Sequence, residues 1–216
     1  MKKYLLFDLD GTLTDPGVGI TSSAAHALRH FGIEVSCREE LYPYIGPPLD
    51  FSFTKYHGIA KQDLNRAIEL FREYFAEKGK FENEVYPGIA DLLKKLKGEG
   101  TSLFVATSKP KKFALEILRH FELDGYFDFV GGSPLEGAGS EKAEVIRSVM
   151  RHVPDISGKT AVMIGDREYD ILGAHECGIS AVGVLYGYGS ELELKNAGAD
   201  FIAKDIKELE AILAPM

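Results

Sequence analysis

The chain has 216 residues, 45% of them hydrophobic, which is enough to bury a full core in one large domain or in a domain with an insertion. A formal net charge of −8 disfavours a nucleic-acid backbone or an anionic membrane as the partner. The two cysteines, Cys37 and Cys177, lie far apart and indicate a reducing compartment. No apolar run reaches membrane-spanning length, and we therefore expect a cytoplasmic protein.

The first predicted strand, residues 4–7, is an apolar run that ends abruptly at acidic residues. Asp8 and Asp10 follow it, and Gly11 marks a turn. Because alternate residues of an extended backbone point to the same side, both carboxylates face one way. At the carboxyl end of a strand in an open α/β sheet, that direction is the crevice where such folds bind ligands. The arrangement suits a divalent cation and phosphoryl chemistry.

Residues 16–86 carry no convincing strand and are predicted to be helical. Apolar residues recur at helical spacing in 20–31 and again in 64–75. Between these two stripes, Ser36 with Glu39 is typical of a capping box and predicts a further short helix. The segment therefore differs in kind from the chain on either side of it.

From residue 87 onward, predicted helices and strands alternate. Strands are expected at residues 103–107, 127–130, 161–164 and 181–184, each after a helix, and Asp205 with Glu208 predicts a capping box that opens the last helix. This alternation is typical of parallel βαβ units, and it predicts a doubly wound, Rossmann-like α/β sheet.

The chain is thus expected to hold an α/β catalytic core, residues 1–15 and 87–216, interrupted by an all-helical cap, residues 16–86. The insertion leaves the first strand directly after the acidic pair. We therefore expect it to lie above the crevice and to act as a lid.

Four motifs occur in order, each at a predicted strand end or loop: Asp8-Leu9-Asp10-Gly11-Thr12, Thr107 at the end of its strand, Lys142 near a helix start, and Gly165 to Asp170. With these motifs the chain resembles the haloacid dehalogenase-like superfamily, in the branch that carries a helical cap after the first motif. The stretch from Ile45 to Leu49 resembles the caps of phosphoglycolate phosphatase-like proteins.

The resemblance implies a Mg²⁺-dependent phosphatase. Asp8 would attack phosphorus and form an aspartyl-phosphate, while Asp10 would act as general acid and base. The substrate's phosphoryl oxygens would be bound by Thr107, by Ser108 after it and by Lys142. The Mg²⁺ ligands would be Asp8, Asp166, Asp170 and the backbone carbonyl of Asp10.

Each of these residues also has an ordinary structural interpretation. Asp8 and Asp10 would serve as turn residues beside Gly11, and Asp170 as an acid that complements the dipole of a first helical turn. Lys142 taken alone would be a solvated helix lysine. Arg167 is expected to pair with an acid of the metal loop, and the glycine-rich stretch 186–189 is expected to be a connecting loop.

The choice of reaction within the family depends mainly on Asp10. Dehalogenation does not need this acid, and no cap lysine lies in an apolar setting suited to a Schiff base, so phosphate ester cleavage remains. The expected substrate is a small phosphorylated metabolite, phosphoglycolate-like, with a 5'-nucleotidase as the alternative. A non-catalytic, phosphate-dependent binding module is the alternative from another class. Gly46 and Pro47 are the predicted specificity element, and a monomer or weak homodimer is expected.

Overall fold

The computed structural model describes residues 3–135, 141–153, 155–158 and 160–214. The chain forms two compact units. The first, Met1–Thr14 with Val85–Met216, is called the core unit, and the second, Asp15–Glu84, is called the helical unit. Among the described residues, no helix has the length and apolar character needed to cross a membrane.

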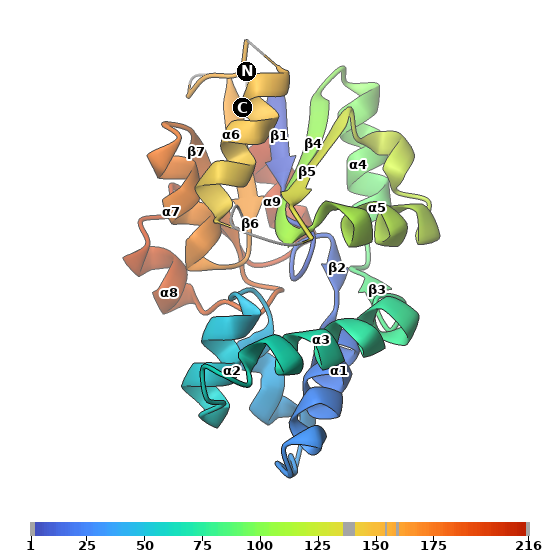
Figure 1. Ribbon diagram of the computed structural model, residues 1–216. Coiled ribbons are helices and arrows are strands. Elements are labelled where there is room, and N and C mark those ends of the chain that lie inside the picture. Colours follow the sequence, from blue (N-terminus) through green and yellow to red (C-terminus); the bar gives the residue numbers. More distant parts are fainter. Residues whose placement is uncertain (1–2, 136–140, 154, 159, 215–216) are drawn as a thin grey trace. The chain divides into compact units, whose positions relative to one another are not determined.

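The core unit is built on a six-stranded parallel sheet in the order β5-β4-β1-β6-β7-β8 (Figure 1). Its strands are β1 (Tyr4–Phe7), β4 (Ser102–Pro110), β5 (Phe129–Ser133), β6 (Ala161–Gly165), β7 (Ser180–Val184) and β8 (Phe201–Ala203). Chain order runs outward from β1 in both directions, so the strand order reverses beside it. In open α/β sheets, ligands bind at such a point, outside the carboxyl ends of the strands. The predicted α/β fold class is confirmed.

Helices cover both faces of this sheet. They are α4 (Ile89–Gly98), α5 (Lys111–His120), α6 (Lys142–His152), α7 (Glu168–Glu176), α8 (Glu191–Asn196) and α9 (Ile206–Leu213), with a 3₁₀ turn, η3 (Asp124–Tyr126). In Figure 1, α6 crosses in front of the sheet and α9 lies behind it. All four residues of β1 are buried, as the continuous apolar run of a strand covered on both sides requires.

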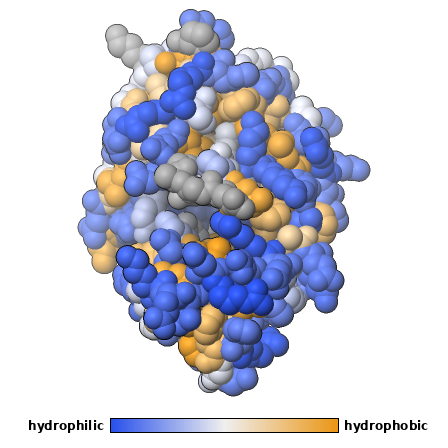
Figure 2. Space-filling model, viewed as in Figure 1, coloured by the Kyte–Doolittle hydropathy of each residue, from blue (hydrophilic) through white to orange (hydrophobic). Residues whose placement is uncertain are grey.

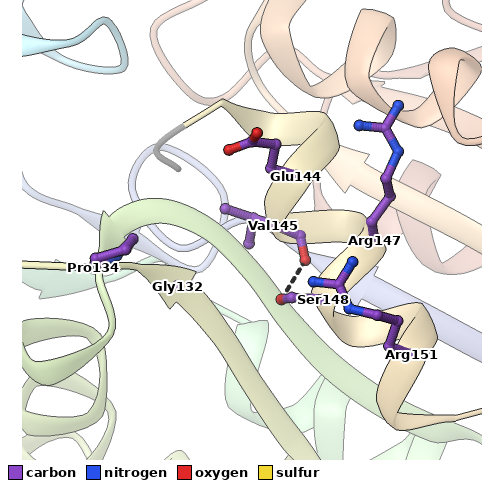
Figure 3. Close-up of a pocket in the computed structure, with 7 residues that line it drawn as sticks. All are labelled: Gly132, Pro134, Glu144, Val145, Arg147, Ser148 and Arg151. Carbon is purple, nitrogen blue, oxygen red and sulfur yellow. Dashed lines mark hydrogen bonds between the residues drawn. The ribbon is translucent and has the colours of Figure 1, made fainter. Parts of the chain in front are cut away.

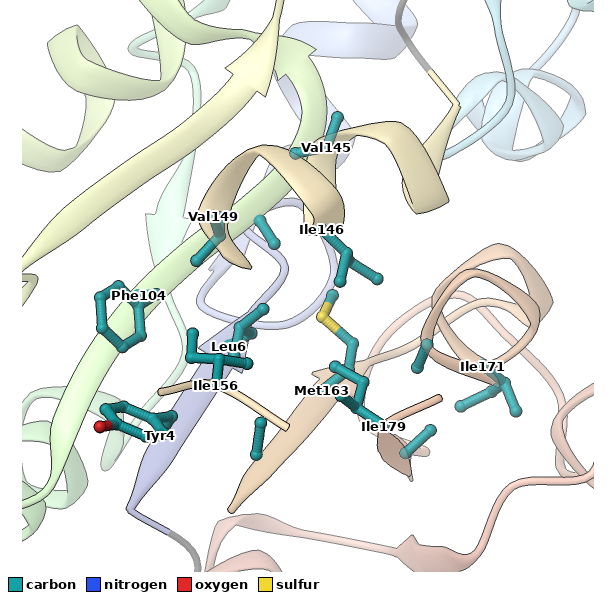
Figure 4. Packing of buried hydrophobic residues seen from close by; sticks show 14 of the residues in the cluster. Tyr4, Leu6, Phe104, Val145, Ile146, Val149, Ile156, Met163, Ile171 and Ile179 are labelled. Atoms are coloured by element: carbon teal, nitrogen blue, oxygen red, sulfur yellow. The ribbon is translucent and has the colours of Figure 1, made fainter. Parts of the chain in front are cut away.

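A hydrophobic cluster joins α6 and α7 to one face of the sheet (Figure 4). Leu6 of β1 and Met163 of β6 lie beside Ile146 of α6, and each of the three is fully buried. Since the first turn of α6 carries Lys142, this packing fixes the position of that lysine relative to the strand ends.

The helical unit contains α1 (Gly17–His30), a 3₁₀ helix η1 (Arg38–Tyr44), α2 (Leu49–His57), α3 (Leu64–Tyr74) and a π-helical turn η2 (Phe75–Gly79). Helix α1 packs against α3, η1 and η2. A Cβ at Gly19 would overlap the carbonyl oxygen of Gly79, so α1 and η2 approach through glycines on both sides. A side chain larger than the hydrogen atom of glycine would not fit at either position.

Several local expectations differ from the structure. Cys37, not Ser36, precedes η1, and no side chain caps that helix, so the first predicted capping box is wrong. At the last helix Asp205 accepts a hydrogen bond from the amide of Glu208 at 2.8 Å, but the Glu208 carboxylate accepts from Lys204 rather than from Asp205.

The sequence did not predict four short elements, because they are too short to show a hydrophobic pattern. β2 (Thr14–Asp15) and β3 (Glu84–Val85) form a separate two-stranded sheet, and β3 falls in the segment expected to hold no strand. Neither α8 nor β8 was expected. Each of these elements has six residues or fewer, too few to establish a hydrophobic period.

Exposed large hydrophobic side chains occur singly on α7 and α8 and as a contacting pair, Phe51 and Tyr56, on α2. On the face seen in Figure 2, hydrophobic residues form small separate groups among hydrophilic ones. Exposed examples, such as Leu172 of α7 and Leu192 of α8, are single residues on their helices. Scattered exposure of this kind is ordinary for a folded protein and marks no binding surface by itself.

Candidate active site

The carboxyl ends of β1, β4 and β6 lie side by side and bring the predicted site residues together. Phe7 pairs with Val105 of β4 and Ile164 of β6, so the three strands are in step near their ends. The amide of Asp8 donates to the carbonyl of Ile164 at 2.9 Å. Asp8, Thr107 and Asp166 therefore lie at the same edge of the sheet.

Three carboxylates converge at this edge. Asp8, Asp166 and Asp170 are buried, and one oxygen from each lies within 4.8 Å of the others. Asp166 follows β6, while Asp170 is in the first turn of α7. Burial and the neighbouring Asp170 charge raise the pKa of Asp166 well above its usual value, although the Tyr188 amide opposes the shift. Burial also raises the pKa of Asp170 to about 6.

Lys142, at the start of α6, joins two of these three carboxylates. Its Nζ lies 3.0 Å from Asp8 Oδ1 and 2.7 Å from Asp170 Oδ1, and it donates to the Ala106 carbonyl at 3.0 Å. The ammonium group thus lies between two carboxylate oxygens and one carbonyl oxygen. Burial works to lower the pKa of Lys142, but the two carboxylates outweigh it and raise that pKa. The interpretation of Lys142 as a solvated helix residue is therefore wrong, since its side chain is only 4% exposed.

Asp10 is paired with a second buried lysine. Lys109 Nζ lies 2.6 Å from Asp10 Oδ2, and the lysine side chain is only 6% exposed. Asp10 Oδ1 is buried and has no hydrogen-bond partner among the described residues. Burial raises the pKa of Asp10, against the opposing charge of Lys109. Sequence reasoning missed Lys109, although it stands two residues after Thr107 at the end of the same strand.

The loop after β7 lies against Asp166. The Tyr188 amide donates to Asp166 Oδ2 at 2.8 Å, and the Tyr186 hydroxyl donates to the carbonyl of Thr12 at 3.1 Å. A Cβ at Gly187 would overlap the Gly11 carbonyl and the Asp166 side chain. The loop does connect β7 to α8, as expected, but it also positions a carboxylate of the cluster.

The ion pair of Arg167 is formed outside the metal loop, while its charge also acts on Asp166 within that loop. Its guanidinium Nε lies 2.8 Å from Glu193 Oε1 on α8, outside the metal loop, and its backbone amide donates to Asp170 Oδ2 at 3.0 Å. Asp170 therefore has a structural role and a place in the site: it caps the start of α7, and its carboxylate also contacts Lys142.

The charges of the cluster leave room for a cation. Four acidic side chains, Asp8, Asp10, Asp166 and Asp170, face two lysines, so full ionisation leaves two negative charges uncompensated. Asp166 Oδ1 is buried without a hydrogen-bond partner in the described part of the chain. Buried carboxylates of this kind need a positive charge or a proton. A divalent cation bound by oxygen atoms of Asp8, Asp166 and Asp170 fits both observations.

The remaining predicted residues lie in two places. Thr107 is buried, and its hydroxyl accepts a hydrogen bond from the Lys109 amide at 3.2 Å; Ser108 after it is half-buried. Gly46 and Pro47 belong to the helical unit, in the turn between η1 and α2, where Gly46 has a φ of 107°. Their contact with a substrate stays a prediction.

A pocket of roughly 460 Å³ opens at another place in the core unit, between α6 and the end of β5 (Figure 3). Its lining consists of Gly132, Pro134, Glu144, Val145, Arg147, Ser148 and Arg151. Arg147 is held by an ion pair with Glu176 of α7. None of the four aspartates of the cluster lines this pocket, so the candidate site remains the edge of the sheet.

Comparison with known proteins identifies relatives over nearly the whole chain. A 5'-nucleotidase of Pseudomonas aeruginosa is 43% identical over 97% of this chain and 94% of its own. The tyrosine-protein kinase PtkA of Mycobacterium tuberculosis is 36% identical over 94% of this chain and 66% of its own length. A phosphoglycolate phosphatase of Vibrio parahaemolyticus is 27% identical over 98% of this chain and 96% of its own.

The fold and the family agree with these relatives. The crystal structure of a predicted phosphatase from Clostridium acetobutylicum has a TM-score of 0.96 and 46% identity, and each chain covers all of the other. The model of the haloacid dehalogenase-like hydrolase family matches residues 5–184. The predicted resemblance is confirmed, and the chain belongs to the haloacid dehalogenase-like hydrolase family.

Proposed function

We propose that this chain is a Mg²⁺-dependent phosphatase that cleaves a small phosphate monoester, a nucleoside 5'-monophosphate in the first place. The observation that carries the proposal is the arrangement around β1. Asp8 lies in a buried group of three carboxylates, two of which, Asp8 and Asp170, are bridged by Lys142, and a further acid, Asp10, lies two residues after Asp8. Phosphoryl transfer through an enzyme carboxylate needs a nucleophile, a proton donor and positive charge together.

Asp8 is the nucleophile in this proposal. The Leu9 amide, at 2.8 Å, and Lys142 both bind Asp8 Oδ1, so the second oxygen, Oδ2, is assigned to the attack. Oδ2 forms a bond to phosphorus while the bond from phosphorus to the ester oxygen breaks. The product on the enzyme is an aspartyl-phosphate, which splits one difficult displacement into two easier ones.

Asp10 supplies and recovers the proton. In its protonated form it gives a proton to the ester oxygen as that oxygen leaves. It then takes a proton from the water whose oxygen attacks phosphorus, and the bond between phosphorus and Asp8 breaks to release inorganic phosphate. General acid–base help of this kind is worth about 10²- to 10⁴-fold in rate.

The remaining groups would balance charge. Mg²⁺ held by Asp8, Asp166, Asp170 and the carbonyl of Asp10 would supply positive charge for the phosphoryl oxygens. Lys142 would neutralise Asp8, and Thr107 with the backbone at Ser108 would donate hydrogen bonds to the phosphoryl group. These assignments rest on the positions of the side chains at the ends of β1, β4 and β6.

The relatives favour a nucleotide over phosphoglycolate. The relative named 5'-nucleotidase is 43% identical, whereas the relative named phosphoglycolate phosphatase is 27% identical. Both kinds of ester share the phosphoryl group and differ in the leaving alcohol. Phosphoglycolate therefore stays as the second candidate, and the leaving group would be the part that specificity residues contact.

Release of inorganic phosphate tests the proposal. Wild type and Asp8→Asn would be incubated with nucleoside 5'-monophosphates, phosphoglycolate, sugar phosphates and p-nitrophenyl phosphate, with Mg²⁺ and with a chelator. The proposal predicts that phosphate release requires Mg²⁺. It also predicts that the rate of release falls by more than about 10³-fold in Asp8→Asn, because no other side chain replaces Asp8 as the nucleophile.

Two results would contradict it. Release by Asp8→Asn at the wild-type rate excludes the aspartyl-phosphate, and no release from any ester by a folded wild type favours a phosphate-dependent binding module. Asp10→Asn separates these classes further, since an enzyme loses turnover but keeps Mg²⁺ binding, whereas a binding module loses nothing.

A further inference from the structure

The structure assigns Lys109 as the residue that positions Asp10 for proton transfer to the leaving group. This inference rests on the proposed function. It starts from a buried ion pair, Lys109 Nζ to Asp10 Oδ2 at 2.6 Å, that no sequence motif named.

The pair occupies only one of the two Asp10 oxygens. Lys109 binds Oδ2, while Oδ1 is buried and has no hydrogen-bond partner among the described residues. A contact at one oxygen restricts the movement of the carboxyl group, and the other oxygen can carry the proton. Lys109 therefore acts on the position of Oδ1 and leaves it available for the reaction.

The end of β4 directs the lysine toward Asp10. Pairing with β5 shifts register between Thr107 and Pro110, and within this irregular stretch the Lys109 amide donates to the Thr107 hydroxyl at 3.2 Å. Ser108 separates the two and is half-buried. One short bend thus connects a proposed phosphate-binding residue, Thr107, to the residue that holds the acid.

Lys109 and Lys142 form ion pairs with different carboxylates. Lys142 bridges Asp8 and Asp170, whereas Lys109 is paired with Asp10. Because Asp10 lies two residues from Asp8, an unbalanced Asp10 charge would face its neighbour across a buried space, where like charges repel strongly. The lysine offsets this repulsion and holds Asp10 in place.

Leaving groups of different basicity test the assignment. Phenyl and p-nitrophenyl phosphate have nearly the same shape, but phenolate is the stronger base and gains far more from a proton than p-nitrophenolate does. The measured quantity is kcat/KM, which covers the steps up to release of the phenol and excludes breakdown of the aspartyl-phosphate. Wild type, Lys109→Met and Lys109→Arg would be compared, with Lys112→Met, an exposed lysine of α5, as the matched control.

The expected result is a selective loss. Lys109→Met should lose about 10- to 100-fold in kcat/KM for phenyl phosphate and less than about 3-fold for p-nitrophenyl phosphate, because only the first needs a well-placed acid. Lys109→Arg should recover part of the loss, and Lys112→Met should match wild type. Circular dichroism and thermal unfolding would establish that each variant is folded.

Equal losses on both esters, or no loss on either, would overturn the assignment, since a lysine that binds phosphate or only stabilises the fold does not distinguish leaving groups. A wild type that releases phosphate from neither aryl ester, nor from any nucleoside 5'-monophosphate or other ester of the panel, would instead overturn the proposed phosphatase function itself. The two failures are therefore distinguishable.

Discussion

Asp166 differs from the other carboxylates of the cluster. Asp8 and Asp170 contact Lys142, and Asp10 contacts Lys109, but among the described residues no lysine pairs with Asp166. Its hydrogen bond comes from the Tyr188 amide, which carries no net charge. Asp166 is thus the carboxylate of the cluster that is not paired with a lysine of the described residues, although the positive charge of Arg167 acts on it and opposes the rise in its pKa that burial causes.

Replacing Asp166 by asparagine should separate metal binding from folding. Asp166→Asn is expected to weaken Mg²⁺ binding by more than about tenfold, because one charged ligand is lost. The metal-free variant should unfold at the same temperature as wild type or higher, since a neutral amide replaces a carboxylate whose pKa burial raises. Isothermal titration calorimetry and thermal unfolding measure the two effects.

The matched control is Asp91→Asn, an exposed acid in the first turn of α4. It should leave Mg²⁺ binding unchanged. If Asp166→Asn binds Mg²⁺ as tightly as wild type, the ion is held elsewhere and the assignment of Asp166 as a ligand fails.

At the residue scale, sequence reasoning found the groups that stand next to an obvious strand end. Asp8 and Asp166 follow apolar strands, and a carboxylate in that position indicates a functional role more than a structural one. Lys109 was missed because its partner, Asp10, lies 99 positions away in the sequence. The burial of Lys142 likewise depends on how α6 packs on the sheet, which a local pattern does not contain.

The element that sequence reasoning undervalued is the loop after β7. Two glycines allow it to lie directly on the β6 loop, because side chains at Gly187 and Gly189 would overlap Asp166. Glycine here serves close backbone approach. A short glycine-rich stretch looks the same in sequence whether it merely connects two elements or packs on a site.

Substituting Gly187 by alanine should therefore damage the site. The new methyl group would displace Asp166, and we expect Mg²⁺ affinity and kcat/KM to fall by about 10-fold or more. Gly98→Ala is the matched control, since Gly98 ends α4 with no atom within 4 Å of an added Cβ, and alanine there should stabilise a helix by up to about 1 kcal/mol.

Phosphate release and calorimetry measure both variants. A Gly187→Ala protein with wild-type activity and Mg²⁺ affinity would mean that the loop yields without moving Asp166. A loss of folding in circular dichroism would locate the effect in stability instead.

Elements were predictable in proportion to their length. Helix α3 and strand β4 carry long apolar patterns, and both occur near the expected residues. The capping box expected at Ser36 failed because its helix is a 3₁₀ helix that starts after Cys37. Helix α8, six residues long, depends on tertiary contacts, among them the Arg167 to Glu193 ion pair.

At the scale of the whole molecule, the sheet topology assembles the site. β1, β4 and β6 are neighbours in the sheet, although about 95 residues separate β1 from β4 and about 50 separate β4 from β6 along the chain. The parallel α/β class could be predicted from alternating helices and strands. The strand order could not, since no local pattern states which strands are neighbours.

The same buried carboxylates should make global stability depend jointly on pH and Mg²⁺. Burial raises the pKa of Asp166 well above its usual value and that of Asp170 to about 6. In the unfolded chain both titrate near the ordinary aspartate value of about 4. Between these pKa values the metal-free folded protein binds more protons than the unfolded chain. The contribution of the two carboxylates to the free energy of unfolding therefore falls as pH rises.

Mg²⁺ bound by these carboxylates would reverse that contribution, because it would stabilise their ionised form. The gain in Tm on adding Mg²⁺ should thus be small near pH 5 and should grow toward pH 7.5, where protons no longer compete. At 100 times the dissociation constant the gain is about 2.7 kcal/mol, which corresponds to roughly 5–10 °C for a chain of this size. Taking the difference with and without Mg²⁺ at each pH removes titrations outside the site, such as that of Asp200, whose pKa is lowered. Thermal scans of wild type and Asp166→Asn would measure this gain in Tm. A gain in wild type that is the same at pH 5 and at pH 7.5 would show that these carboxylates do not bind the ion.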